Sequence, residues 1–270
     1  MPKLTHNRRP IPILVYHQID EAPPKGSPFR SLYVTPDAFA RQMSFLKLLG
    51  YRGLSMGDLL PYLIGEKEGK VVGITFDDGY QNNIANALPV LKKQGFSSTC
   101  YAVSGLLGQT NSWDKHLGIA QVPLMTEAHV RQWVAGGQEI GSHTHQHLDL
   151  RGADDAACRA DMALGKTSLE AVVDRPVDHF CFPYGRYVLK HVEMARVAGF
   201  QTATTTQRSR CHAQTDLLQL PRVPVLRATS LPVFWLKIAT AYEDLRKLRS
   251  TSLPVFRLKI ATAYKDLRKK

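Results

Sequence analysis

The sequence predicts an α/β fold in which short strands and helices alternate around a barrel. Short apolar runs bounded by turn residues alternate with helix-type patterns along most of the chain. Polar residues that could carry chemistry follow directly after several of these runs, and barrel folds place their active sites at the carboxyl ends of the strands. A chain of 270 residues, 44% of them hydrophobic, is long enough to build the core of such a domain.

The predicted strands are the apolar runs. They lie at residues 11–16, 71–76, 98–104, 138–142, 179–182, 201–206 and 220–225. The predicted helices fill most of the intervals, at residues 35–50, 83–95, 126–135, 153–173 and 188–198.

The helix over 35–50 carries the clearest boundary signals. Thr35 is placed to cap its amino end, Pro36 suits the first helical position, and Gly50 follows the last turn. In the helix over 83–95, Pro89 lacks a backbone N–H and is expected to kink the helix.

The last 42 residues contain an internal repeat. Residues 229–248 recur as 251–270 with 17 of 20 positions identical. A solenoid needs at least three units, so two copies indicate a tandem duplication. We therefore divide the chain into a main domain, residues 1–228, and a duplicated basic helical tail, residues 229–270. The first copy is expected to form the last helix of the domain, anchored by Trp235, and the second an appended basic amphipathic helix.

The basic charge is concentrated in this tail. It carries +7 of the formal net charge of +12. No stretch interleaves aromatic and basic residues as a nucleic-acid platform would, so nucleic acid is not expected as a partner. The second helix is either a solvated helix without function or a weak contact with anionic lipid.

The sequence is expected to remain in the cytoplasm, with the inner membrane surface as an alternative. No stretch approaches the roughly 20 apolar residues that span a bilayer, and the apolar run near the amino terminus is shorter than a signal-peptide core. The four cysteines form no C-x-x-C pair, which agrees with a reducing compartment.

Two clusters of polar residues point to metal chemistry. Asp77 and Asp78 directly follow the strand over 71–76, and their adjacent charges require compensation. His143 and His147 follow another predicted strand. One helical turn would place both imidazoles on the same side, whereas an extended segment would bring His145 onto their face as well. One aspartate and two imidazoles form a common open site for a divalent metal.

A third motif identifies a family resemblance. The segments "TFDDG", "SHTHQH" and "FPYG" occur in this order within residues 11–226. Together they resemble the NodB-like polysaccharide deacetylases, carbohydrate esterase family 4. "PILVYH" and "LPRVPV" are similar to the branch that contains bacterial poly-N-acetylglucosamine deacetylases.

The resemblance implies a deformed (β/α)7 barrel and a site with defined roles. Asp78, His143 and His147 would bind the metal, which is usually Zn²⁺, with Co²⁺ and Ni²⁺ as alternatives. Asp77 would be the general base, and the backbone N–H of Tyr184 would help to hold the oxyanion.

Two features of the family pattern are missing, and we expect replacements from other strands. The commonest third motif has an arginine where this chain has Cys181, and we hypothesise that Arg222 pairs with Asp77 instead; an ordinary surface arginine is the alternative. No carboxy-terminal Leu-x-His segment is present. His17 is expected to be the general acid, because the first and last strands of a closed barrel are neighbours; a buried, hydrogen-bonded histidine is the alternative.

Other residues are expected to shape the substrate groove. Pro183 and Tyr184 belong to the third motif, and Trp113 could stack on a sugar face, whereas Trp133 is expected in a helix core. The remaining histidines of interest are expected to support neighbours or to lie at the surface; they are His145, His179 and His212.

The predicted function is metal-dependent hydrolysis of the N-acetyl group of N-acetylhexosamine units in a glycan or glycolipid, with release of acetate. A lipid-linked or nucleotide-linked sugar would suit a cytoplasmic protein, whereas the branch resemblance favours a polymer. Deformylation or O-deacetylation by the same site and a non-catalytic glycan-binding module remain alternatives.

Overall fold

Seven parallel strands close into a barrel in the structure, a computed structural model that describes residues 9–249. The strands are β1 (Ile13–Tyr16), β5 (Val71–Phe76), β6 (Thr99–Ala102), β7 (Glu139–Ser142), β8 (His179–Cys181), β9 (Thr202–Arg208) and β10 (Leu220–Pro224). β1 pairs with β10, Leu14 opposite Val223, and with β5, Leu14 opposite Ile74. The first and last strands are therefore neighbours, as predicted.

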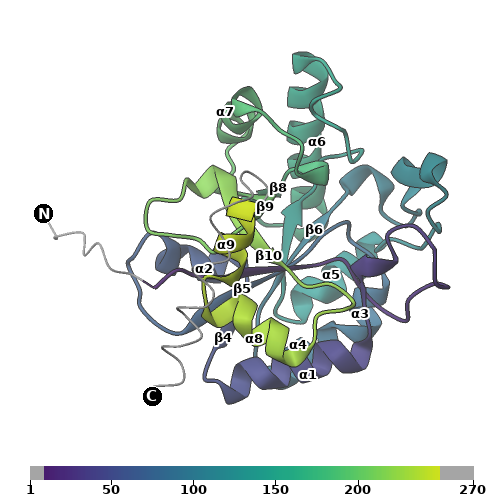
Figure 1. Cartoon of the computed structure of the whole chain (residues 1–270). Coiled ribbons are helices and arrows are strands. Elements are labelled where there is room, and N and C mark those ends of the chain that lie inside the picture. The colour runs from purple at the N-terminus through teal and green to yellow at the C-terminus, as the bar shows by residue number, and fades with distance from the viewer. Residues whose placement is uncertain (1–8, 250–270) are drawn as a thin grey trace, which may run out of the picture.

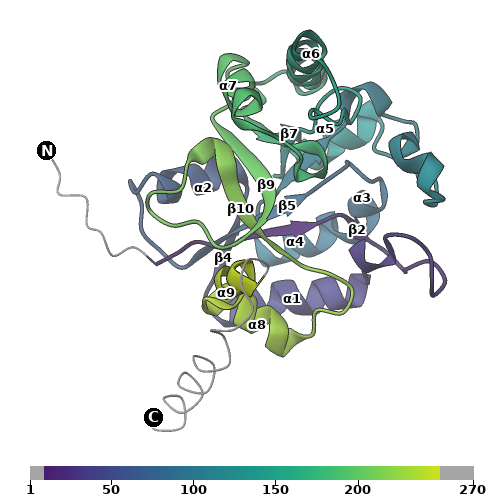
Figure 2. The ribbon, with the colours of Figure 1, turned by 45° about the horizontal axis from the view of Figure 1, so that its top comes forward.

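Helices surround this barrel (Figure 1). They are α1 (Pro36–Leu48), α2 (Met56–Leu63), α3 (Asn82–Asn86), α4 (Leu88–Gln94), α5 (Glu127–Ala135), α6 (Asp155–Val173), α7 (Leu189–Val197), α8 (Leu231–Ala239) and α9 (Tyr242–Arg249). In both views α6 and α7 lie on one side of the barrel, and α1 and α8 lie on the opposite side (Figures 1 and 2). The predicted deformed (β/α)7 barrel is confirmed.

β1 and β5 read as nearly continuous apolar runs because helices and barrel core cover both of their faces. All six residues of β5 are buried. Its last residue, Phe76, packs against the rings of Tyr16 and Trp133, each with a centroid distance of 5.6 Å. Trp133 is fully buried, so its predicted place in a helix core is confirmed.

Local signals set the ends of the helices. The Thr35 hydroxyl accepts a hydrogen bond from the Ala38 N–H, and Pro36 begins α1, as predicted. Near Pro89 the outcome is stronger than the predicted kink, because the chain forms two separate helices, α3 and α4, with Pro89 in the first turn of α4.

The sequence did not predict β4 (Arg52–Leu54) and α2. β4 pairs with the first half of β5, but it is only three residues long and contains Gly53. A Cβ at Gly53 would lie 2.7 Å from the Phe96 ring, so packing requires glycine at this position of the strand. α2 contains Pro61, a residue that normally interrupts a helix, so the sequence pattern did not indicate a helix at this position.

The first copy of the repeat forms two helices, α8 and α9, where one was expected. Trp235 is 39% exposed, so its predicted role as the anchor is wrong. Helical periodicity turns Phe234 and Ile238 toward the barrel instead, and both join the main core. The buried Lys237 ammonium lies 2.7 Å from the Glu243 carboxylate, so this lysine is part of the packing.

The second copy of the repeat, residues 251–270, lies outside the described residues. Within residues 9–249, none of the helices combines the length and the apolar content that crossing a membrane requires. The four cysteines are buried free thiols, in agreement with the absence of a disulfide pattern.

Candidate active site

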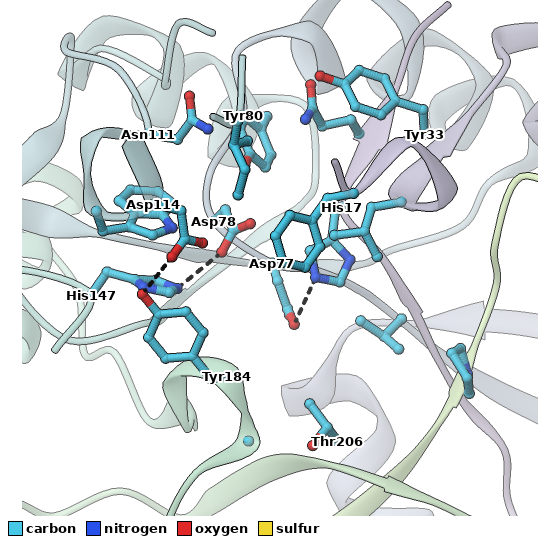
Figure 3. A pocket seen from close by; sticks show the side chains of 18 of the residues that line it. His17, Tyr33, Asp77, Asp78, Tyr80, Asn111, Asp114, His147, Tyr184 and Thr206 are labelled. Atoms are coloured by element: carbon cyan, nitrogen blue, oxygen red, sulfur yellow. Dashed lines mark hydrogen bonds and ion pairs between the residues drawn. The ribbon is translucent and has the colours of Figure 1, made fainter. Parts of the chain in front are cut away.

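Three loops bring the predicted site residues together at the carboxyl ends of the strands (Figure 3). Asp77 and Asp78 follow β5, His143 follows β7, and Tyr184 follows β8. Parallel strands of one barrel end on the same side, so residues more than 60 positions apart in the sequence meet there.

These loops concentrate unusual backbone conformations. Among residues 9–249, six residues other than glycine have a left-handed backbone, and four of them lie here: Asp78 (φ 72°), Thr144 (φ 63°), His147 (φ 56°) and Tyr184 (φ 57°). Such conformations persist only where the surroundings enforce them, and they cluster at functional sites.

The predicted helical turn over 143–147 is wrong. Left-handed Thr144 and His147 interrupt any helix, and the segment is an irregular turn. The imidazoles still face each other, because the turn folds back and places the two ring centroids 4.8 Å apart.

His143 directs its Nε2 atom at Asp78. Its Nδ1 lies 2.8 Å from the Cys181 carbonyl oxygen, which can only accept, so Nδ1 carries the hydrogen. Nε2 is then the atom that faces Asp78 Oδ1, 3.4 Å away. A lone pair and a carboxylate oxygen repel each other unless a cation, either a proton or a metal ion, lies between them.

His147 approaches the same oxygen from another direction. Its Nε2 also lies 3.4 Å from Asp78 Oδ1. The ring stacks on Trp113 (centroids 4.3 Å apart, planes at 16°) and meets Tyr184 edge-on at 4.6 Å. These two aromatic side chains fix the orientation of the imidazole.

Burial and mutual contact set the protonation of this group. Burial raises the pKa of Asp78, but hydrogen bonds from His143 and His147 outweigh it and bring that pKa well below its usual range. Burial lowers the pKa of His147, which favours the neutral imidazole that binds metals. Burial also lowers the pKa of His143, but the neighbouring Cys181 and Asp78 raise it well above its usual value.

The three side chains fit a divalent transition metal. Their donor atoms all lie within 4.8 Å of one another and all three residues are buried. Ligands held at about 2.1 Å around a tetrahedral zinc ion are ~3.4 Å apart, which is the separation that Asp78 Oδ1 shows from each imidazole nitrogen. Two imidazoles, one carboxylate and an adjacent cavity form an open site of the catalytic kind.

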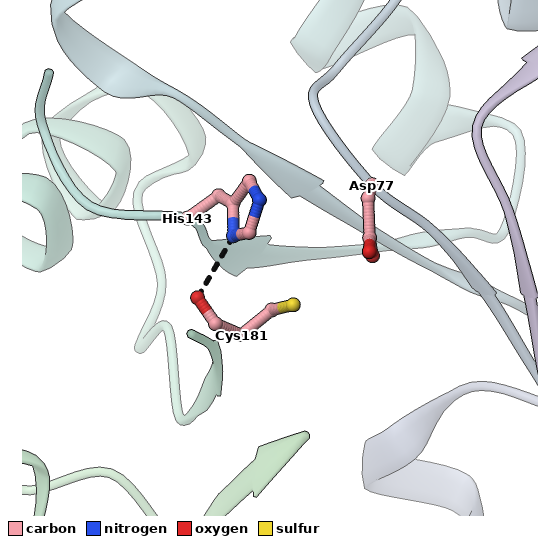
Figure 4. Close-up of side chains that lie close together, drawn as sticks. All are labelled: Asp77, His143 and Cys181. Carbon is pink, nitrogen blue, oxygen red and sulfur yellow. Dashed lines mark hydrogen bonds between the residues drawn. The ribbon is translucent and has the colours of Figure 1, made fainter. Parts of the chain in front are cut away.

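A second group, formed by Asp77, His143 and Cys181, also has close donor atoms but does not suit a cation (Figure 4). The Arg222 guanidinium already occupies it: Nη2 lies 2.7 Å from Asp77 Oδ2 and 3.2 Å from Cys181 Sγ. A second positive charge at this position would be repelled by the arginine.

Arg222 is the partner of Asp77. It is 1% exposed and donates hydrogen bonds to both carboxylate oxygens, at 2.6 and 2.7 Å. Its remaining hydrogen bonds go to the Thr205 carbonyl oxygen, the Thr75 hydroxyl and Cys181 Sγ, so every guanidinium N–H has an acceptor. Burial raises the pKa of Asp77, but the Arg222 charge and hydrogen bonds bring it below its usual value.

His17 lies on the other side of Asp77. Its Nε2 is 3.9 Å from Asp77 Oδ2, and its side chain is 23% exposed (Figure 3). It follows β1, the strand that pairs with both β5 and β10, so His17, Asp77 and Arg222 come from three adjacent strands. His17 is therefore partly exposed and lies close to Asp77.

These residues open into one cavity of about 420 Å³. The residues of its wall include the following: His17, Asp77, Asp78, Trp113, His143, His147, Tyr184 and Arg222. Pro183 is buried and is not part of this wall, so the predicted contact with substrate is not supported by its position.

The sequence analysis missed Asp114, Phe29 and Tyr33 on the same wall. Asp114 accepts a hydrogen bond of 3.1 Å from the Tyr184 hydroxyl, which joins the loop carrying Trp113 to the loop after β8. Its only sequence signal is its position next to Trp113 in a loop already expected to shape the groove.

The other histidines lie outside the reactive group. His145 Nδ1 lies 2.8 Å from the Ser104 hydroxyl, and His212 is exposed. His179 begins β8, at the opposite end of the barrel, where it contacts Glu139 at 3.5 Å.

Comparison with known proteins identifies the family. The family model for polysaccharide deacetylases matches residues 64–203. The Bacillus subtilis protein YxkH, named as a polysaccharide deacetylase, is 30% identical over 217 residues, which cover 80% of this chain and 71% of the relative. The chain belongs to the polysaccharide deacetylase family.

Two further relatives support the same conclusion. A poly-β-1,6-N-acetyl-D-glucosamine N-deacetylase of Staphylococcus epidermidis is 23% identical, and the match covers 83% of this chain and 81% of that protein. The structure of the deacetylase PplD of Streptococcus pyogenes superposes with a TM-score of 0.76 at 26% identity, covering 86% of this chain and 99% of the other. The predicted class, a hydrolase of non-peptide carbon–nitrogen bonds, is confirmed for this polysaccharide deacetylase.

Arg222→Ala is expected to raise the pKa of Asp77, because only the weaker effects of His17 and His143 then oppose burial. Asp77 acts as a carboxylate, and protonation at low pH removes that form. With a raised pKa this protonation begins at higher pH, so the acid limb of the pH–rate profile should move to higher pH. Breaking a buried ion pair also costs about 3–5 kcal/mol of stability. Arg222→Lys keeps the charge and should shift the limb less.

Arg186→Ala is the matched control, because Arg186 lines the same cavity but pairs with Asp149. A folded Arg222→Ala protein whose acid limb coincides with that of the wild type would exclude control of Asp77 by Arg222.

Proposed function

We propose that this polysaccharide deacetylase removes N-acetyl groups from N-acetylglucosamine units of a glycan, with a divalent metal ion held by Asp78, His143 and His147. One observation carries the proposal: next to this three-residue donor set, and outside it, lies the carboxylate of Asp77, which is 4% exposed and which Arg222 keeps ionised. One aspartate can therefore bind a cation while its neighbour accepts a proton.

The chemistry of amide hydrolysis requires both groups. A divalent cation bound by these three side chains would supply the Lewis acidity that an unreactive amide carbonyl needs. The lowered pKa of Asp77 keeps it ionised and able to accept a proton, and water bound to a Lewis acid gives up that proton more readily. The three-residue donor set supports metal dependence, with zinc as the first candidate.

The residues of the chain then divide the proton transfers. Water attacks the acetyl carbon while Asp77 takes its proton, and the backbone N–H of Tyr184 donates to the carbonyl oxygen as negative charge develops there. His17 donates a proton to the amide nitrogen as the carbon–nitrogen bond breaks. The products are acetate and the free amine of the sugar.

The cavity offers an aromatic contact for an extended glycan. Its wall includes Phe29, whose side chain is 49% exposed and whose backbone is left-handed (φ 52°). An exposed ring on the wall of a cavity can stack on the apolar face of a sugar, so we assign Phe29 to a sugar next to the one that is deacetylated. The relative in Staphylococcus epidermidis acts on a polymer of N-acetylglucosamine, which agrees with this assignment.

The wild-type protein loaded with Zn²⁺ is expected to release acetate from β-1,6-linked and β-1,4-linked N-acetylglucosamine oligomers. Removing the metal with a chelator should abolish release, and adding Zn²⁺, Co²⁺ or Ni²⁺ should restore it. Asp78→Asn should lose bound metal and activity together, whereas Asp37→Asn, in the exposed first turn of α1, should lose neither.

Acetate measurement, metal analysis and an O-acetylated glycan in the same panel separate the alternatives. Glycan binding without acetate release would favour a binding module, and release from the O-acetylated glycan alone would favour an O-deacetylase.

His17→Asn is expected to lower kcat for the N-acetyl substrate by ~10²–10⁴-fold, the usual contribution of a general acid. Hydrolysis of 4-nitrophenyl acetate should change little, because nitrophenolate leaves without protonation. Metal content should equal that of the wild type. Equal losses on the two substrates would contradict the assignment of His17 as the acid.

Phe29→Ala is expected to raise KM for an oligomer about tenfold, corresponding to a loss of about 1.4 kcal/mol of ring stacking. KM for an N-acetylglucosamine monosaccharide should not change, and Phe29→Tyr should behave as the wild type. Unchanged kinetics with oligomers would remove Phe29 from the binding surface.

A further inference from the structure

The short helix α3 binds the segment that carries His17. Three of its five residues are asparagines: Asn82, Asn83 and Asn86. Asn82 donates to the Gln18 side chain at 3.0 Å and Asn86 to the Ile19 carbonyl oxygen at 2.8 Å. In a helix read from sequence alone, such residues would be assigned to the surface, but here they face β2 (Gln18–Ile19), which lies beside α3 (Figure 2).

Asn83 makes the central contact. It is fully buried, its Nδ2 donates to the His17 carbonyl oxygen at 2.8 Å, and its Oδ1 accepts from the Ile19 N–H at 3.1 Å. One amide therefore brackets the backbone on both sides of Gln18. This pair of bonds needs a donor and an acceptor on one short side chain, which asparagine provides and aspartate or leucine does not.

The backbone is also held on the other side of His17. The Asp77 N–H donates to the Tyr16 carbonyl oxygen at 3.0 Å. The peptide units before and after the His17 Cα are thus hydrogen-bonded to Asp77 and Asn83, respectively. Both partners belong to one short stretch, residues 77–83, that begins with the two aspartates.

We propose that Asn83 is a positioning residue for His17, fixing the general acid relative to the base Asp77. The inference rests on the proposed function, because it assigns a purpose to the position of His17. Because His17 and Asp77 are both hydrogen-bonded to, or part of, the same stretch of chain, the distance between the acid and the base stays constant. Misplacing a catalytic group by about 1 Å costs on the order of 10²-fold in rate.

The test compares Asn83→Asp with Asn86→Asp. Asn83→Asp can still accept from Ile19 but places an anion against the His17 carbonyl oxygen. Asn86→Asp makes the same change in the same helix, against the Ile19 carbonyl oxygen.

Asn83→Asp is expected to lower kcat for the N-acetyl substrate ~10–100-fold with KM and metal content unchanged. Hydrolysis of 4-nitrophenyl acetate, which needs no acid, should stay within about twofold of the wild type.

Asn86→Asp should retain both activities, although both variants lower the melting temperature. The double variant His17→Asn/Asn83→Asp should be no slower than His17→Asn alone, because the two residues act through one group. Should Asn83→Asp not fold, Asn83→Ser replaces it: the hydroxyl is too short to bracket both groups, and the same selective loss is expected.

Wild-type kcat for the amide in a folded Asn83 variant would overturn the inference, as would equal losses of amide and ester activity. The proposed function fails separately, when the wild-type protein releases no acetate or when His17→Asn loses both activities equally.

Discussion

Two consecutive aspartates are buried at the mouth of the barrel, and neither charge can remain uncompensated there. Asp77 is 4% exposed and Asp78 is 7% exposed. An isolated buried carboxylate costs several kcal/mol, so each requires its own partner. Arg222 meets Asp77, and two imidazoles that fit a divalent cation meet Asp78. Because the partners differ, two identical side chains acquire different surroundings: Asp77 is an ionised carboxylate held by a guanidinium, and Asp78 lies between two imidazoles in a donor set that fits a metal ion.

Closure of the barrel brings the different partners to the two aspartates. β1 pairs with β10 on one edge and with β5 on the other, so a residue within β10 and a residue that follows β1 both reach Asp77. Arg222 reaches it from one side and His17 from the other, although 205 positions of the chain separate these two residues. A carboxylate between a fixed guanidinium and a partly exposed imidazole is buried on one side and open to the cavity on the other.

The departure from the commonest third motif has a structural explanation. Where that motif has an arginine, this chain has Cys181, whose sulfur lies 3.2 Å from Arg222 Nη2. The small thiol leaves room for a guanidinium that enters from β10. The charge that steadies Asp77 is therefore retained although its position in the sequence has moved, and the network stays satisfied because Arg222 also binds Thr75 and Thr205.

The sequence by itself determined the strands, most helices and the three motifs, because apolar runs, caps and clustered polar residues are local signals. The sequence did not predict β4, which is short and contains Gly53, or α2, which contains Pro61. In both elements the packing overrides a weak local preference.

Tertiary structure alone decided that Thr144 and His147 adopt left-handed conformations, that Asp114 joins Tyr184, and that Asn83 holds His17. Contacts between residues far apart in the chain depend on how the strands close and on which side chains then come within hydrogen-bonding distance, and neither leaves a periodic pattern in the sequence.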